Sequence, residues 1–295
     1  MPYPDLLAIA GLDYPAILGA VLAANGVVDP QKWATCSFDS GEAPALCRMG
    51  EGMWALELWH DALLGAGVIG QTYVDSYREL YGQTSAADVM LYVAALTAAY
   101  GDMVAEGLVT QGAPINVCVS CKHPAFAAAC IAQKEGLPIY TVVGEDDGTL
   151  AAAKRGAPLA PRWQVLAPYA AKGFAKAFPD VLEGNVSAEE ADDAILEVLE
   201  DSGYLLSPTS ARAARLAAIY REEAESRNPM VVVIGHHPYL EAMTLAQVLT
   251  DETPKDEYKA MRLCELESGW EIPEALLNPQ KAAEIRKILQ NGERL

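Results

Sequence analysis

The sequence predicts an α/β fold in which a mostly parallel sheet carries helices on both faces and so forms three layers. Residues 115–143 read as strand, helix and strand, the unit that joins two parallel strands. Residues 230–234 (MVVVI) are a continuous, mostly β-branched run, which is typical of a strand buried on both faces. Apolar residues make up 52% of the 295 residues, which is enough for a large core.

The first third of the chain is rich in Ala and Leu and contains three predicted elements. Pro15 precedes a helix over residues 16–24, which Gly26 ends, because Pro suits the first turn of a helix and Gly its C-terminal cap. Residues 53–58 alternate between apolar and other side chains, as a half-buried strand does. Residues 86–100 are apolar nearly all round, which predicts a buried helix.

The middle of the chain gives the clearest pattern. It reads as a strand at 115–119, a turn at 120–124, a helix at 125–135 closed by Gly136, a strand at 139–143 and a turn at 145–148. Such a unit predicts two parallel strands joined by a right-handed crossover.

The second half begins with residues 156–186, which are punctuated by Pro and Gly and only weakly patterned. Ser187 and Glu190 form a capping-box signature that opens a helix, and Gly203 ends that helix. Another helix is predicted to start after Ser207 and to run to about residue 225, before the strand at 230–234.

Open parallel sheets bind ligands at the carboxyl ends of their strands. Three predicted loops follow such ends, at residues 120–124, 144–148 and 235–238. We therefore expect these loops to form one candidate site, whatever its ligand is.

The charge balance excludes several classes of partner. Lys and Arg total 21 and Asp and Glu total 40, giving a formal charge of −19, so little positive charge exists to neutralise the phosphates of a nucleic acid. No apolar run reaches the ~18–20 residues that cross a bilayer, and no basic residue precedes Lys32 as a secretory signal would require. Six cysteines are too few for a disulfide framework. We expect a cytoplasmic protein with reduced thiols.

Seven segments, in this order along the chain, resemble threonine synthase, a pyridoxal-phosphate-dependent lyase of the tryptophan-synthase-β fold type. They are residues 12–18 (LDYPAIL), 56–60 (LELWH), 84–100, 117–139, 203–211 (GYLLSPTSA), 229–239 and 271–276 (EIPEAL). Their shared order indicates common ancestry, and the chain is identified as a divergent, truncated member of that family.

The resemblance also predicts how the chain is organised. In the family a smaller, substrate-holding domain lies between the second and third matched segments, whereas here only residues 68–83 remain between them. The resemblance therefore implies the large domain of the fold without the small one. We expect residues 1–82 to be an N-terminal segment packed on a main α/β domain of residues 83–295.

The departures from the family bear directly on activity. The lysine that forms the Schiff base with the cofactor falls on Gly67, and no lysine occurs between Lys32 and Lys122. The residue near the cofactor's ring nitrogen falls on Gly235, which is followed by His236. Because pyridoxal chemistry needs the amine and the ring-nitrogen partner, these losses predict that the old activity has decayed.

The family's glycine-rich phosphate loop is also replaced. Its place is taken by Ser120, Cys121, Lys122, His123 and Pro124. Glycines let a backbone wrap closely around a phosphate, and side chains in their place make the same cradle doubtful. Lys122 and His123 at the start of a helix are nevertheless consistent with an altered or vestigial site for a small anionic ligand.

The same loop contains thiols. Cys118 and Cys121 form a C-x-x-C, with His123 two residues on and His236 and His237 at the end of another strand, so a zinc or redox site can be drawn. The alternative is that both thiols fill buried positions and that one His is packed and the other exposed. We favour this alternative, because the second C-x-x-C of a zinc ribbon is missing.

Three functions follow, in this order of preference. The first is a threonine synthase-like pseudoenzyme that binds no cofactor and acts as a binding or interaction module, as a homo-oligomer or with a protein partner, because losing a domain exposes apolar surface. The second is an active pyridoxal-phosphate lyase on a phosphorylated amino acid, with Lys122 as its lysine. The third is new thiol or zinc chemistry at residues 118–123.

Overall fold

A mixed sheet organises the part of the chain that the computed structural model describes, which is residues 45–57, 85–235, 237–278, 280 and 283. Its strands lie in the order β1-β2-β6-β3-β4-β5. β1 pairs with β2 in antiparallel fashion, and every other neighbouring pair is parallel. The strands are β1 (Ala45–Gly50), β2 (Met53–Glu57), β3 (Ile115–Ser120), β4 (Ile139–Glu145), β5 (Val181–Gly184) and β6 (Met230–Ile234).

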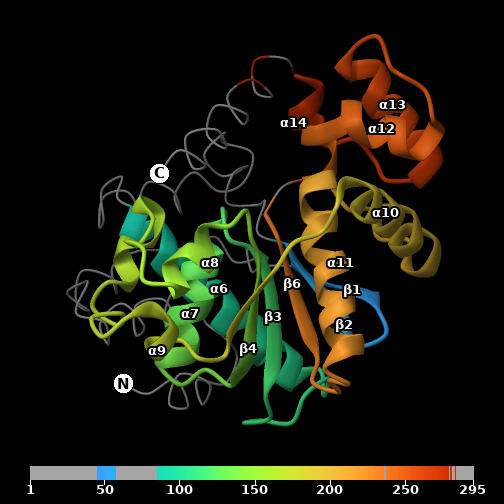
Figure 1. Cartoon of the computed structure of the whole chain (residues 1–295). Coiled ribbons are helices and arrows are strands. Elements are labelled where there is room, and N and C mark those ends of the chain that lie inside the picture. The colour runs from blue at the N-terminus through green and yellow to red at the C-terminus, as the bar shows by residue number, and fades with distance from the viewer. Residues whose placement is uncertain (1–44, 58–84, 236, 279, 281–282, 284–295) are drawn as a thin grey trace, which may run out of the picture.

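Helices cover both faces of this sheet (Figure 1). One face carries α6 (Ser85–Ala105), α7 (Ala125–Lys134), α8 (Thr149–Lys154), the 3₁₀ helix η1 (Pro161–Leu166) and α9 (Phe174–Ala177). The opposite face carries α10 (Ala188–Ser202) and α11 (Pro208–Glu223). The chain continues from β6 into η2 (Pro238–Glu241), α12 (Ala242–Thr250), α13 (Glu257–Ser268) and α14 (Glu274–Leu277), which lie together beyond one end of the sheet.

The alternation of strand side chains divides the core into two clusters. Val117 and Val119 pack with the α6 and α7 layer, whereas Cys118 between them packs with the α10 and α11 layer. All five residues of β6 are buried because helices cover both of its faces. This confirms the predicted α/β fold with helices on both sides of a mostly parallel sheet.

The strongest local signals in the sequence are also confirmed. The predicted strand–helix–strand unit is β3, α7 and β4, with β3 and β4 parallel. The hydroxyl of Ser187 accepts a hydrogen bond from the backbone N–H of Glu190, whose carboxylate accepts from the N–H of Ser187, so the predicted capping box opens α10. Gly203 caps the other end of this helix.

Several elements were not predicted from the sequence. They are β1, which pairs with β2 through a tight turn, the short helix α8, the elements η1, α9 and β5 of the weakly patterned region, and the helices after β6. β5 lacks a signal because it has only four residues, of which Val181 alone is fully buried. The predicted helix at 16–24 lies outside the described residues.

The predicted division at residues 82 and 83 also lies outside the described residues and stays a prediction. β1 and β2, which come from the first of the two predicted segments, are strands of the same sheet as the rest. Among the helices that the structure describes, none is long and apolar enough to cross a membrane.

The α7 layer provides a test of the fold. Phe126 is fully buried, and its ring centroid lies 5.0 Å from that of Trp163. We expect Phe126→Ala to lower the free energy of unfolding by about 3–5 kcal/mol, through lost burial and the cavity left behind, as measured by urea denaturation. The control is Leu266, which is 80% exposed. Leu266→Ala should change the free energy of unfolding by less than about 0.5 kcal/mol. Similar losses in both variants would contradict this packing.

Candidate functional site

The sheet order brings the three candidate loops together. β6, β3 and β4 are neighbours and run parallel, so their carboxyl ends lie at one edge of the sheet, on the side from which the chain leaves β6 for α12 (Figure 1). The turn predicted at 145–148 begins at Asp146 in the structure, one residue later than predicted, because β4 extends through Glu145. We call this edge, with loops 120–124, 144–148 and 235–238, the carboxyl edge.

Two glycines let these loops approach one another closely. A Cβ atom on Gly235 would lie 2.5 Å from Cδ2 and 2.7 Å from Nε2 of His123, so the imidazole rests directly on the backbone that follows β6. A Cβ atom on Gly144 would lie 2.5 Å from Sγ of Cys121. Any larger residue at either position would force these side chains to move. His236 and Gly67 lie outside the described residues.

The loop at residues 120–126 is closed by its own hydrogen bonds. Pro124 has no N–H group, and the N–H groups of residues 121, 122, 123, 125 and 126 all have acceptors within the chain. In that order, the acceptors are Glu145 O at 2.8 Å, Ser120 Oγ at 3.4 Å, Ser120 O at 2.9 Å, His123 Nδ1 at 3.2 Å and His123 O at 3.0 Å. A phosphate at this loop would have to displace the chain's own acceptors.

The neighbouring loop after β4 is closed in the same way, by carboxylates. Asp146 is buried and accepts hydrogen bonds from the N–H groups of Leu150 at 2.9 Å and Ala151 at 3.1 Å, so it occupies the start of α8. Asp147 accepts from both the N–H and the hydroxyl of Thr149. These bonds, chiefly the one from the Thr149 hydroxyl, lower the pKa of Asp147.

Several charged side chains at this edge pair with one another, whereas Arg162 donates from Nε to the backbone oxygen of Cys121 at 3.0 Å and has a buried Nη2 without a hydrogen-bond partner. The hydroxyl of Ser120 donates to Oε2 of Glu145 at 3.2 Å, and Arg212 lies 4.0 Å from the other oxygen of that carboxylate. The ammonium group of Lys122 lies 3.8 Å from Asp147, and the Lys122 side chain is 61% exposed. Lys122 therefore lies at the surface as one half of an ion pair, rather than inside an enclosed site.

The two thiols of the C-x-x-C pack into different core clusters. Sγ of Cys118 donates to the backbone oxygen of Ala213 at 3.1 Å in the α10 and α11 layer, whereas Cys121 packs with α7. Burial raises the pKa of both thiols well above the usual range, so both are held in the protonated, poorly nucleophilic form. The spacing itself carried this information, since residues three apart on an extended chain point to opposite faces.

His237 is buried, and its Nδ1 accepts a hydrogen bond from the N–H of Tyr239 at 3.2 Å. This bond begins η2, which gives His237 a structural role. In the part of the chain that the structure describes, no three His, Cys, Asp or Glu side chains gather as metal ligands would.

One buried acidic residue at this edge was not predicted from the sequence as a site residue. Glu57 ends β2 with its side chain only 7% exposed, and the hydroxyl of Tyr204 donates to it at 2.9 Å. The thiol of Cys47, on the neighbouring strand, also donates to it. An acidic residue within an otherwise apolar strand was the signal, because a buried carboxylate requires donors of this kind.

Solved structures of other proteins share this fold. A search of solved structures finds the pyridoxal-phosphate-bound threonine synthase from Brucella melitensis, with a TM-score of 0.59 and 14% identity over 100% of this chain and 91% of that one. It also finds threonine synthase from Escherichia coli, with a TM-score of 0.57 and 14% identity over 98% of this chain and 90% of that one. This chain shares its fold with threonine synthases. No protein-family model and no curated protein sequence matches it.

The contact between Glu57 and Cys47 predicts that the Cys47 thiol reacts slowly with alkylating reagents. Burial, and then the charge of Glu57, raise the pKa of Cys47 from 9.0 to about 11, so at pH 8 its thiolate fraction is about a hundredfold below that of an ordinary cysteine. We expect iodoacetamide to modify Cys47 correspondingly slowly at pH 8, with a rate that still rises with pH above 9, as followed by peptide mass mapping.

The variant Glu57→Gln should speed this modification several-fold, because it removes the charge and leaves an oxygen for the Tyr204 hydroxyl. Glu267→Gln, at an exposed position on α13, is the matched control and should leave the rate unchanged. A Cys47 rate that is the same in both variants would show that Glu57 does not influence this thiol.

Proposed function

We propose that this chain is a divergent threonine synthase-like protein that has lost pyridoxal-phosphate catalysis and acts as a binding or interaction module. The observation that carries the proposal is the closed hydrogen bonding of residues 120–126. The fold shared with threonine synthases supports the ancestry, and the closed loop supports the loss of the cofactor.

The phosphate is the part of the cofactor that this loop fits worst. A bound phosphate needs several N–H donors aimed at it, and here those donors are already used. Breaking each internal bond costs roughly 0.5–1.5 kcal/mol before any new contact forms. The side chain of His123 also fills the space above Gly235, which matches the family's position beside the ring nitrogen.

Charge adds to this misfit. Glu145 ends β4 at the carboxyl edge, Asp146 and Asp147 follow it, and Lys122 is already paired with Asp147. A doubly negative phosphate would have to compete with Glu145 and Asp147 for the nearby cations, which are Lys122, Arg162 and Arg212. The sequence suggested that Lys122 and His123 could bind a small anionic ligand. The same acidic side chains and the same closed loop disfavour that binding.

The amine that the cofactor requires has no evident replacement at this edge. The lysine position of the family matches Gly67, and Lys122, the candidate replacement, is at the surface in an ion pair. A catalytic lysine must be neutral and directed into an enclosed site, whereas pairing with a carboxylate keeps an ammonium group charged.

We place the interaction surface of this module at the carboxyl edge and expect a homo-oligomer or a complex with a protein partner, in the cytoplasm. By the resemblance, the family's second domain covers this edge, and a surface that has lost its cover is a candidate for association. Light scattering on the purified chain tests this assignment, and a monomer across the micromolar range would contradict self-association.

Cofactor uptake tests the proposal directly. We expect the purified protein, after incubation with pyridoxal phosphate and removal of excess, to show no visible absorbance from a protein-bound Schiff base and no stoichiometric lysine adduct after borohydride reduction. Lys122→Ala and Lys172→Ala should behave alike, because Lys172 is an exposed lysine on a different loop and reports only non-specific reaction.

A threonine synthase that binds the cofactor serves as the positive control. A stoichiometric band that Lys122→Ala abolishes and Lys172→Ala keeps would establish the active-lyase alternative. A stoichiometric adduct on any other lysine would equally overturn the loss of the cofactor.

A further inference from the structure

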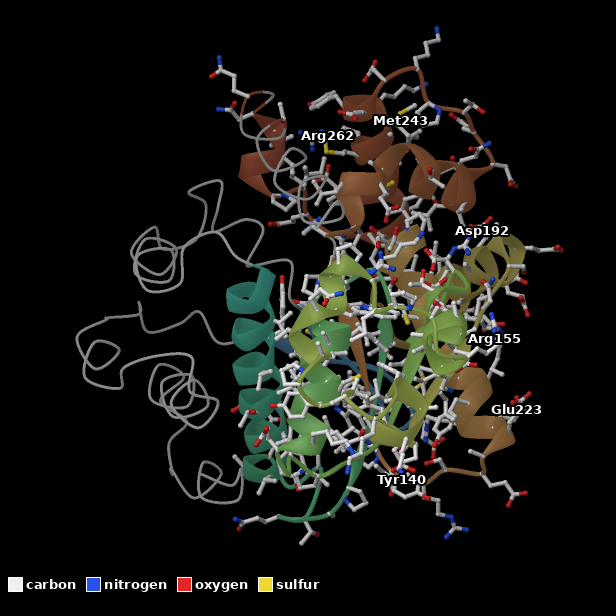
Figure 2. The ribbon with its side chains drawn as sticks, turned by 60° about the vertical axis from the view of Figure 1, so that its left-hand side comes forward. Tyr140, Arg155, Asp192, Glu223, Met243 and Arg262 are labelled. Atoms are coloured by element: carbon white, nitrogen blue, oxygen red, sulfur yellow. The ribbon has the colours of Figure 1, made fainter. Side chains whose placement is uncertain are left out.

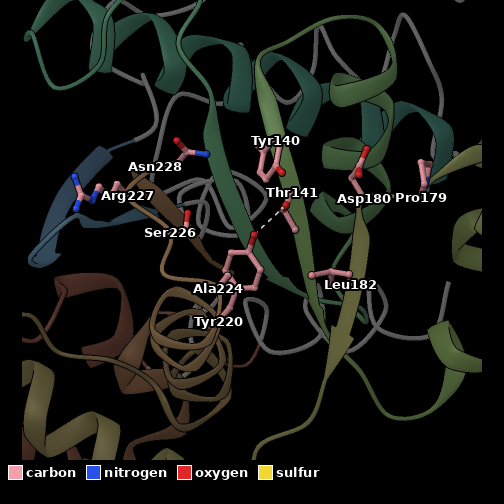
Figure 3. A pocket seen from close by; sticks show the side chains of 10 residues that line it. All are labelled: Tyr140, Thr141, Pro179, Asp180, Leu182, Tyr220, Ala224, Ser226, Arg227 and Asn228. Atoms are coloured by element: carbon pink, nitrogen blue, oxygen red, sulfur yellow. Dashed lines mark hydrogen bonds between the residues drawn. The ribbon is translucent and has the colours of Figure 1, made fainter.

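A pocket lies at the opposite edge of the sheet from the loops discussed above. It has a volume of about 530 Å³ and is formed where β4 and β5 begin, where α11 ends and where the chain turns toward β6 (Figure 3). This volume is within the ~300–1,000 Å³ of small-molecule sites. In Figure 2, Tyr140 on its rim lies at the opposite end of the molecule from Met243 and Arg262. We call it the amino-edge pocket.

The pocket lining is dominated by uncharged hydrogen-bonding groups. The hydroxyl of Tyr220 donates to Oγ1 of Thr141 at 3.0 Å, which leaves the Thr141 hydroxyl hydrogen and the lone pairs of Tyr220 for a ligand (Figure 3). Ser226 accepts from Nδ2 of Asn116 at 3.0 Å and keeps its own hydroxyl hydrogen. The side chain of Asn228 completes this group.

The rim combines an aromatic ring with a carboxylate. Tyr140 is 61% exposed, and Leu182, which also lines the pocket, is 39% exposed. Asp180 lies before β5 on the far side of the pocket from Asn228 (Figure 3). One hollow is thus surrounded by an aromatic ring (Tyr140), a carboxylate (Asp180), an amide (Asn228) and several hydroxyl groups.

We propose that the amino-edge pocket binds a neutral, polyhydroxylated small molecule, such as a sugar. The apolar C–H face of a sugar ring packs on an aromatic side chain, and its hydroxyl groups pair with carboxylate, amide and hydroxyl partners. This site is separate from the carboxyl edge and does not depend on the function proposed there.

Other ligand classes fit the pocket less well. Arg227 is the cation of the lining, but its side chain points away from Tyr140 and Asp180 in Figure 3. A phosphate would then meet the Asp180 carboxylate without a facing cation, which is unfavourable. A wholly apolar ligand would leave the hydroxyl and amide groups of the lining without partners.

The test is a chemical-shift titration of the full chain by NMR. D-glucose, maltose and myo-inositol are compared with inorganic phosphate and with leucine. We expect saturable shifts at Thr141, Ser226 and Asn228 with the neutral polyols and no such response to phosphate or leucine. In Tyr140→Ala and in the nearly isosteric Asp180→Asn, the dissociation constant should rise about tenfold.

Tyr258→Ala is the matched control, because Tyr258 is a 55% exposed tyrosine on α13, far from the pocket. It should bind as the parent does, and all three variants should keep the parent's melting temperature. Three results would overturn the proposal: no saturable response to any polyol, equal binding in Tyr140→Ala and Tyr258→Ala, or a stronger response to phosphate or leucine.

Discussion

Backbone N–H groups at the carboxyl end of β3 find their acceptors within the chain, and the character of the candidate site depends on this. The start of a helix is a site for an anion only while its N–H groups are unpaired. Here Ser120, His123 and Glu145 supply the acceptors, and Pro124 removes one donor altogether. In this structure the loop after β3 is therefore satisfied by the chain's own acceptors.

The close packing at Gly235 and Gly144 follows from the same arrangement. His123 uses Nδ1 to accept from the N–H of Ala125, and this bond holds its ring near Gly235. The loop and the two neighbouring strand ends thus form one packed unit, with the carboxylate of Asp146 satisfying the start of α8 beside it. Binding a large cofactor here would require several of these contacts to open at once.

Sequence reasoning succeeded where a signal is local. The capping box at Ser187, the strand–helix–strand unit and the buried β6 each depend on a few neighbouring residues, and each is found as expected. It failed at α8, whose first turn depends on the carboxylate of Asp146, and at β5, whose pairing with β4 is decided by tertiary contact.

The candidate site was predictable in position and unpredictable in chemistry. Strand order alone brings the loops after β3, β4 and β6 together, but which atoms accept each N–H group depends on side-chain rotamers. Cys118 and Cys121 belong to different core clusters, and this could have been predicted from the alternation of side chains along a strand. The C-x-x-C motif instead suggested that the two thiols act together.

The two edges of the sheet differ in what they leave available to a ligand. At the carboxyl edge, the backbone N–H groups of residues 121–126 other than Pro124 and most charged side chains already have partners within the chain, apart from the guanidinium of Arg162. At the amino edge, Thr141 comes from β4, and Ser226 and Asn228 come from the connection between α11 and β6. These residues line a hollow with an exposed aromatic rim and keep hydrogen-bonding capacity for a ligand. No motif marks such a site, because its residues meet only when β4, α11 and the start of β6 are packed together. The amino-edge pocket is therefore where we expect a neutral small molecule to bind.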